Sequence, residues 1–228
     1  MKTAADGSNL QVLFEDNHLL AVNKRCGDLV QGDKTGDETL LDAVKNYIAT
    51  KYQKPGAVFA GVVHRLDRPT SGVVVFARTS KALARMNALF SSRETEKVYH
   101  CLIEGKPQQE AATLTHFLVR NEKNNTSKAF EKEVTNSKKA VLHYKLVRAY
   151  TNYSLLEIQL ETGRHHQIRA QLAACGMVIK GDLKYGAKRS NPNGGISLHA
   201  RELTFVHPVA KSEVKIRAPY PAGDIFEG

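Results

Sequence analysis

The chain of 228 residues is long enough to bury one large hydrophobic core or two smaller ones. Hydrophobic residues make up 42% of it and charged residues 25%, a composition that is ordinary for a soluble globular protein. Lys and Arg number 33 against 23 acidic residues, and the net charge of +10 favours a polyanionic partner, nucleic acid before an anionic membrane surface. Solubility alone is the alternative reading of that charge.

The cysteines, Cys26, Cys101 and Cys175, are widely spaced and form no CxxC pair. They therefore predict neither a disulfide framework nor a zinc ribbon, and they favour a reducing compartment. The first residues lack the apolar run of a signal peptide, and no apolar stretch is long enough to span a bilayer. We expect a cytoplasmic protein that does not enter membranes.

The order of the expected elements predicts an α+β fold with a mixed, mostly antiparallel sheet and flanking helices. We expect a flexible N-terminus over residues 1–9 and one folded domain over residues 10–228. β-branched and alternating apolar runs predict strands at residues 12–14, 19–22, 61–63, 73–76, 98–103, 141–147, 155–160 and 196–205. Apolar residues at helical spacing predict helices at residues 39–47, 80–90 and 164–175. The polar, Lys-rich residues 120–139 predict a surface loop or a hairpin excursion.

The segment HRLDRPTSG at residues 64–72 places one carboxylate between two apolar runs. If the preceding strand continued through it, Arg65 and Asp67 would point to the same face. His64 and Leu66 would then share the opposite face. The proline and the Thr-Ser-Gly run that follow are typical of a stiff turn, so a carboxylate would be presented at a strand end beside a long cation. The alternative is that the carboxylate only caps its own turn, as Asp often does.

A second segment, LETGRHHQIRAQL, begins at Leu160. On a helix that starts near Arg164, this residue shares one face with apolar residues at 168, 172 and 175. An inward guanidinium stays charged and needs a carboxylate or a phosphate, and Asp67 is a candidate partner. His165 and His166 would point about 100° apart on a helix, so they do not form the i, i+4 pair that binds zinc, and we expect no metal.

Together the two segments resemble the RluA-type family of RNA pseudouridine synthases. The resemblance runs from about residue 12 to residue 208, and it is supported by VLFEDNHLLAVNK, EKVYHCLIEG, GDLKYG and ISLHARELTFVHP. It departs at residues 24–27, where the family's Lys-Pro-x-Gly turn is replaced by Lys-Arg-Cys-Gly. The resemblance implies the pseudouridine synthase fold with a central RNA-binding cleft, and a catalytic domain over residues 10–228 without the small S4-type RNA-binding domain of many relatives.

The resemblance also implies roles for individual residues. Asp67 matches the catalytic Asp of uridine isomerisation, and Arg164 matches the basic residue that pairs with it. Tyr99 matches the tyrosine that stacks on the target base, and Arg65 matches the residue that enters the RNA stack as the uridine leaves. Leu198 resembles the apolar residue that lines the base pocket. Another carboxylate in a motif, at position 182, belongs by resemblance to a loop-shaping turn.

The implied reaction converts uridine to pseudouridine without oxidation or hydrolysis, so we expect an isomerase that needs no cofactor. A carboxylate would act either as nucleophile near C1′ or as base at C2′. We expect a monomer that acts on a stem-loop of ribosomal or transfer RNA and flips the target base out of its helix. The rival hypotheses are a catalytically silent RNA-binding module and a carboxylate hydrolase, which would require a second catalytic carboxylate.

Overall fold

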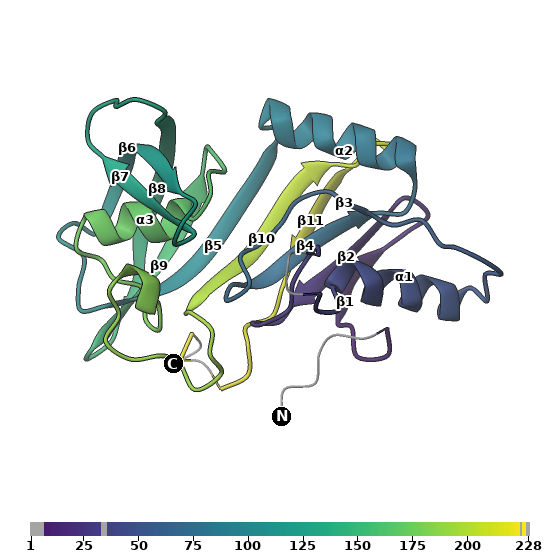
Figure 1. Cartoon of the computed structure of the whole chain (residues 1–228), viewed down its shortest axis with the longest axis horizontal. Helices are drawn as coiled ribbons and strands as arrows, with labels where there is room; N and C mark the ends of the chain where they lie inside the picture. Colours follow the sequence, from purple (N-terminus) through teal and green to yellow (C-terminus); the bar gives the residue numbers. More distant parts are fainter. Residues whose placement is uncertain (1–6, 33–35, 224, 227–228) are drawn as a thin grey trace. The chain divides into compact units, whose positions relative to one another are not determined.

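The structure is a computed structural model that describes residues 7–32, 36–223 and 225–226 (Figure 1). Most of the N-terminus that we expect to be flexible, residues 1–6, lies outside the described residues. The chain divides into two compact units, residues 1–96 with 200–222 and residues 97–199 with 223–228. The single domain expected over residues 10–228 stays a prediction, and each unit is described by itself.

The first unit is built on a sheet in which both faces of the central strands are buried. Its strands lie in the order β1 (Val12–Glu15), β2 (Leu19–Lys24), β4 (Ser71–Ala77) and β10 (Leu198–Val206), with β3 (Gly61–Val62) beside β4 and β11 (Glu213–Arg217) beside β10. β2 and β4 pair antiparallel, from Leu19 opposite Ala77 to Lys24 opposite Gly72. Runs of Val, Leu and Ala explain this burial, because a strand covered on both faces needs apolar side chains in both directions.

Two helices cover the two faces of this sheet (Figure 1). Helix α1 (Leu40–Lys51) packs on the face that carries Leu20, Val22 and Phe76. It begins with a capping box, in which Thr39 and Asp42 satisfy each other's backbone N–H groups. Helix α2 (Ser80–Ser92) packs on the opposite face, and the side chain of its N-cap residue, Thr79, accepts from the backbone N–H of Ala82.

The second unit combines a meandering antiparallel sheet with one α-helix. Its strands lie in the order β5 (Thr95–Glu104), β9 (Tyr153–Leu160), β8 (Lys138–Ala149), β6 (Ala111–Asn121) and β7 (Thr126–Phe130). Helix α3 (Gln167–Ala174) packs its Ile168 and Leu172 into the core of this unit, and the 3-10 turn η1 (Leu183–Tyr185) follows. Hydrophobic residues of β5, β8 and β9 complete that core.

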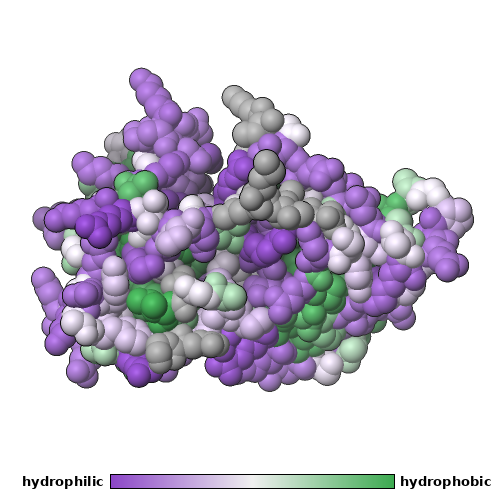
Figure 2. Space-filling model, turned by 90° about the horizontal axis from the view of Figure 1, so that it is seen from below, coloured by the Kyte–Doolittle hydropathy of each residue, from purple (hydrophilic) through white to green (hydrophobic). Residues whose placement is uncertain are grey.

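The α+β class with a mostly antiparallel sheet and flanking helices is confirmed. The polar stretch at residues 120–139 holds a hairpin, because β6 and β7 meet across the turn before Thr126. Strands β6, β7 and β11 have no counterpart among the expected strands. Figure 2 shows a face on which hydrophilic residues predominate and hydrophobic residues form small separate patches. In the part of the chain that the structure describes, every helix is too short or too polar to cross a bilayer.

Candidate active site

The HRLDRPTSG segment crosses the first unit between β3 and β4. The condition for alternating side chains, a strand that continues through the segment, is not met, because β3 ends at Val62 and the next residues are irregular. His64 and Leu66 therefore do not share a face. The His64 ring stacks on Phe90 of α2 at 4.9 Å, and its Nε2 atom accepts a hydrogen bond of 3.2 Å from the backbone N–H of Val75. Leu66 packs against the other core cluster, the one under α1.

Asp67 opens the tight turn that leads into β4. The backbone N–H of Thr70 donates to the carbonyl oxygen of Asp67 at 3.0 Å, so the turn is closed through the main chain. Asp67 is half-buried, whereas Arg65 is exposed. The two residues therefore lie in the same segment of the first unit, with the carboxylate on the more enclosed part and the guanidinium toward solvent.

Lys24, the last residue of β2, holds the Asp67 turn in place through hydrogen bonds to its backbone. Its side chain is 1% exposed, and its ammonium group donates to the carbonyl oxygens of Arg25 and Arg68, each at 3.0 Å, and of Thr70 at 2.7 Å. Burial lowers the pKa of Lys24 to about 8, and the charges of nearby acidic groups, Asp67 among them, limit the fall. At neutral pH the group is therefore mainly an ammonium, which can donate all three of its hydrogens.

A second set of hydrogen bonds joins the Lys-Arg-Cys-Gly turn after β2 to the Asp67 turn. The backbone N–H of Gly27 donates to the carbonyl of Arg68 at 2.9 Å, and Arg68 Nε donates back to the carbonyl of Gly27 at 3.1 Å. Arg68 also forms an exposed ion pair with Asp37 at 3.0 Å. Gly27 has a φ of +98°, a conformation that glycine adopts at little cost. The Lys-Arg-Cys-Gly turn therefore still ties itself to the Asp67 turn, although it lacks the family's proline.

Gly72 allows the strand after the Asp67 turn to approach its neighbour closely. Its φ is +118°, and a Cβ atom added there would lie 2.2 Å from the carbonyl oxygen of Ala200 in β10. No side chain fits at that distance, so the glycine of the Thr-Ser-Gly run is required by packing. This contact fixes the start of β4, and with it the end of the turn that carries Asp67.

The expectation that Arg164 is an inward residue on the first turn of a helix is wrong. Helix α3 begins at Gln167, and Arg164 lies three positions earlier, half-exposed. Its backbone N–H donates to Gln167 Oε1 at 3.0 Å, and its Nε donates to the carbonyl of Lys139 at 3.1 Å. His166 takes a left-handed conformation with φ of +51°, which keeps the helix from extending back to Arg164.

The buried arginine of this helix is Arg169, and its partner is Asp182. The guanidinium donates to both carboxylate oxygens, at 2.6 and 2.7 Å, and the two side chains are 3% and 1% exposed. Arg169 also lies over the ring of Tyr185, 4.9 Å from its centroid. A bidentate pair of this kind satisfies a charge that the core could not otherwise hold. Asp182 thus shapes the loop, as its motif implies.

His166 extends this network as a neutral side chain. Arg169 Nη1 lies 3.0 Å from His166 Nε2, and because a guanidinium only donates, Nε2 accepts. The ring proton is then on Nδ1, which donates to the Tyr185 hydroxyl at 2.9 Å. Burial first, and then the charges of Arg169 and His165, lower the pKa of His166 to about 2. The two histidine rings stack at 3.9 Å rather than pointing apart along a helix.

Tyr99 and Leu198 meet at one hydrophobic cluster of the second unit. Leu198 is 4% exposed and belongs to that cluster, and half-buried Tyr99 packs against it. Tyr99 lies in β5, opposite Ile158 of β9. The structure therefore brings Tyr99 and Leu198 together in one unit, and Arg65 and Asp67 together in the other. The pairing of Asp67 with Arg164 stays a prediction.

Sequence reasoning missed Lys24, which holds the Asp67 turn, and the buried Arg169–Asp182 pair of the second unit. Lys24 ends an apolar strand, LLAVNK, and a cation directly after such a run signals a buried charge only when its acceptors are known. The acceptors are backbone carbonyls from a segment 44 to 46 positions away, which no sequence pattern reveals. For Arg169, no helical periodicity could single it out, because the first six residues of α3 are all buried.

The comparisons with known proteins agree on one family. A model of the RNA pseudouridylate synthase family matches residues 18–174. Ribosomal large subunit pseudouridine synthase D of Zymomonas mobilis is 33% identical over 222 residues, which cover 93% of this chain and 69% of that protein. tRNA pseudouridine synthase C of Vibrio cholerae is 32% identical, over 92% of this chain and 90% of its own length. The solved structure of human RNA pseudouridylate synthase domain containing 4 has the same fold, with a TM-score of 0.77 at 22% identity over 93% of this chain and 89% of that one.

Proposed function

Because the chain belongs to the RNA pseudouridylate synthase family, we propose that its Asp67 promotes the isomerisation of a uridine to pseudouridine in structured ribosomal or transfer RNA. The observation that carries the assignment of Asp67 is the construction of its turn. The half-buried carboxylate is held just before β4 by three contacts of its turn. These are the buried ammonium of Lys24, the reciprocal hydrogen bonds between Gly27 and Arg68, and the close approach of Gly72 to Ala200. Positioning of this kind is what a catalytic group needs.

The reaction breaks the N1–C1′ bond, turns the uracil and forms a bond between C5 and C1′. The C5 proton is lost and N1 gains one, so the composition of the nucleotide is unchanged. An ionised Asp67 serves either of the two chemical roles, attack at C1′ or removal of a proton at C2′. Neither role needs a cofactor, and independence of metals and cofactors stays a prediction.

The other matched residues would act around the flipped base. Arg164 would hold the carboxylate of Asp67 in its ionised form, and this half-exposed residue lies on a short turn tied to β8. Tyr99 would stack on the uracil, with Leu198 beneath it in the same hydrophobic cluster. Arg65, which is exposed, would fill the space that the uridine leaves in the RNA helix.

For the substrate, we propose only the class of RNA, ribosomal or transfer RNA. One relative is named for the ribosomal large subunit and another for transfer RNA, and both cover most of this chain. The net charge of +10 suits the phosphates of either RNA. Action as a monomer in the cytoplasm stays a prediction.

The test is the Asp67→Asn substitution, assayed by tritium release from 5-tritiated uridine in RNA from cells that lack the enzyme. We expect turnover to fall by at least about 10³-fold while RNA affinity stays within about 3-fold, because the amide keeps the shape but loses the carboxylate chemistry. The exposed Glu94→Gln variant is the control for loss of one negative charge in the same unit. Release at the normal rate from Asp67→Asn would overturn the assignment, and release from neither protein would overturn the proposed substrate.

A further inference from the structure

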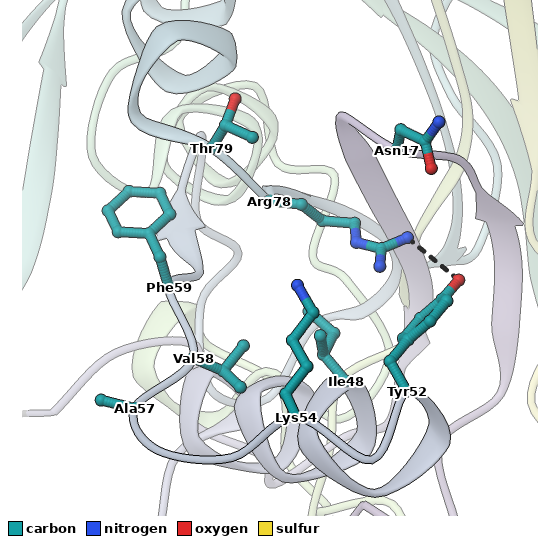
Figure 3. Close-up of a pocket in the computed structure, with 9 residues that line it drawn as sticks. All are labelled: Asn17, Ile48, Tyr52, Lys54, Ala57, Val58, Phe59, Arg78 and Thr79. Atoms are coloured by element: carbon teal, nitrogen blue, oxygen red, sulfur yellow. Dashed lines mark hydrogen bonds between the residues drawn. The ribbon is translucent and has the colours of Figure 1, made fainter.

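A pocket of about 290 Å³ opens in the first unit beside the end of helix α1 (Figure 3). The ring of Tyr52 borders it on one side and the ring of Phe59 on the other, with Ile48 and Val58 between them at its base (Figure 3). The volume is close to the lower limit of small-ligand sites, roughly 300 Å³. It therefore suits a ligand of about one nucleotide in size and not a long segment.

The two aromatic side chains are unusually open to solvent. Tyr52 is 43% exposed and Phe59 is 46% exposed, although large aromatic side chains are usually mostly buried in the core. Exposed aromatic rings at the rim of a pocket provide flat surfaces on which a planar ligand can stack. Phe59 lies in the loop between α1 and β3, whose neighbouring residues Val58 and Ala60 pack into the core while the Phe59 ring stays exposed.

The charged part of the pocket lining is cationic, beside the neutral polar residues Asn17 and Thr79. Lys54 and Arg78 line it, and no acidic side chain does among the described residues. The ammonium end of Lys54 points into the space between the two aromatic rings (Figure 3). Within the described part of the chain no ion pair engages Lys54, whereas Arg78 is joined to Glu15 at 3.4 Å. Lys54 is therefore the charge available to an anionic ligand.

A hydrogen-bonded cluster keeps one side of the pocket in shape without a ligand. Glu15 accepts from the hydroxyls of Tyr47 and Tyr52, each at 2.8 Å, and also from Lys51. Arg78 stacks over the Tyr52 ring at 4.5 Å and donates to its hydroxyl at 3.2 Å. Burial works to raise the pKa of Glu15, but the hydrogen bonds from the lysine and the two tyrosines lower it. The Glu15 carboxylate therefore stays ionised and holds these side chains together.

The pocket is separate from the Asp67 turn. Arg78 and Thr79 follow the last residue of β4, whereas the Asp67 turn precedes its first residue. Seven residues of strand lie between them, which corresponds to about 20 Å at roughly 3.3 Å per residue. A ligand in the pocket would therefore not be the uridine that reacts.

We propose that this pocket binds one unpaired nucleotide of the substrate RNA at a distance from the modified uridine, with its base stacked on Phe59 and its phosphate held by Lys54. The inference rests on the proposed function, since it takes RNA as the substrate. Aromatic rings interleaved with cations are the recurrent way in which proteins hold single-stranded nucleic acid without reading its sequence. A protein ligand is the competing occupant, and it predicts no change in RNA affinity when the pocket is altered.

The test compares Phe59→Leu and Lys54→Gln with the wild type, using a fluorescent single-stranded oligoribonucleotide of ten mixed nucleotides. We expect Phe59→Leu to weaken binding about 5-fold or more, because the apolar volume remains but stacking is lost. We expect Lys54→Gln to reduce the slope of log affinity against log salt by about 0.7, the value for one phosphate contact on a single strand. Phe59→Tyr should retain wild-type affinity, and the exposed Lys106→Gln in the other unit controls for general loss of charge.

A cross-link adds a direct readout. The same oligonucleotide carrying 5-iodouridine should attach on irradiation to the peptide that contains Tyr52 and Phe59. With natural RNA, both variants should raise KM and leave kcat unchanged. The inference would be overturned if both variants kept the wild-type affinity, salt slope and KM and if the cross-links formed only at other peptides. That result differs from a failure of the proposed function, in which the wild-type protein itself would release no tritium.

Discussion

The ammonium nitrogen of Lys24 lies 2.7 Å from the carbonyl oxygen of Thr70, inside a site where the lysine is 1% exposed. A lysine here acts as a three-way clamp on main-chain carbonyls, in contrast to the usual pairing of a buried ammonium with a carboxylate. The clamp joins the end of β2 to the turn that carries Asp67. The position of the proposed catalytic carboxylate therefore depends on a side chain that need not touch the substrate.

Replacing Lys24 with Met removes the donors and keeps the chain length. We expect Lys24→Met to lower the free energy of unfolding by about 2 kcal/mol or more, because the buried carbonyl of Thr70 loses its lysine donor, which costs about 1–3 kcal/mol, and the bonds to Arg25 and Arg68 are lost as well. Tritium release should fall as well, even where the variant is fully folded. Urea unfolding and the tritium assay measure the two effects. Lys81→Met on the exposed face of α2 is the control, and equal stability of the two variants would contradict the clamp.

The same lysine predicts a dependence of stability on pH. Its pKa is about 8 in the folded protein against 10.5 when unperturbed, so between these values the unfolded chain binds a proton that the folded protein has released. Stability must then rise with pH across the window from 8 to 10.5, by at most about 3 kcal/mol, relative to Lys24→Met. Unfolding midpoints of both proteins at pH 7, 9 and 10.5 provide the measurement. A difference that stays constant with pH would show that Lys24 is not desolvated.

Gly72 and Gly27 offer a matched pair for separating steric clash from backbone strain. Both have positive φ, but a Cβ at position 72 meets Ala200 at 2.2 Å, whereas nothing lies within 4 Å at position 27. We expect Gly27→Ala to cost about 1 kcal/mol of stability and Gly72→Ala about 3 kcal/mol or more. Thermal unfolding of the two variants tests this, and equal costs would mean that β4 and β10 can separate freely.

The Arg169–Asp182 pair should behave as a buried ion pair in a double-mutant cycle. We expect Arg169→Met or Asp182→Leu alone to destabilise the protein by about 3–5 kcal/mol, because each leaves a buried charge without a partner. The double variant should be less destabilised than the sum of the two single changes. Denaturant unfolding of the four proteins measures the coupling. Strict additivity would indicate that the two side chains do not interact in solution.

His166 predicts a loss of stability in acid. Its pKa of about 2 in the folded protein lies below its ordinary value of 6.5, so the folded state stays neutral while the unfolded chain takes up a proton. The stability that the neutral ring contributes is present above pH 6.5 and is lost as the pH falls toward 2, by about 1.4 kcal/mol per pH unit. His166→Asn tolerates the left-handed backbone and should flatten this dependence. Parallel acid unfolding curves for the two proteins would refute the neutral assignment.

The core and the motifs could be predicted from the sequence because they depend on local patterns. The apolar runs that became β2 and β4, and the helical spacing of α1 and α2, each specify their own structure. The start of α3 could not be predicted, because one left-handed residue, His166, displaces it by three positions. Arg164 consequently lies outside the helix, and the buried arginine of the helix is Arg169.

The residues that hold the Asp67 turn are harder to predict than the proposed catalytic residue itself. Asp67 stands in a segment specific enough to single it out, but the alternation of side chains expected around it fails because β3 ends early. Lys24 reaches its acceptors across 44 or more positions of sequence, and the Glu15 cluster joins residues up to 63 positions apart. Such long-range polar contacts depend on the tertiary fold, and local patterns in a single sequence do not reveal them.

His64 has a consequence for genetic experiments. Its ring nitrogen accepts from the backbone of β4 at a place where a strand would otherwise provide the acceptor, and its ring packs on Phe90. A saturation library scored by the amount of pseudouridine in cells would rank substitutions at positions 64 and 67 alike, as equally intolerant. The steady-state abundance of each variant would tell them apart, since we expect loss of His64 to deplete the protein, whereas loss of Asp67, in its proposed catalytic role, should leave normal amounts of inactive protein.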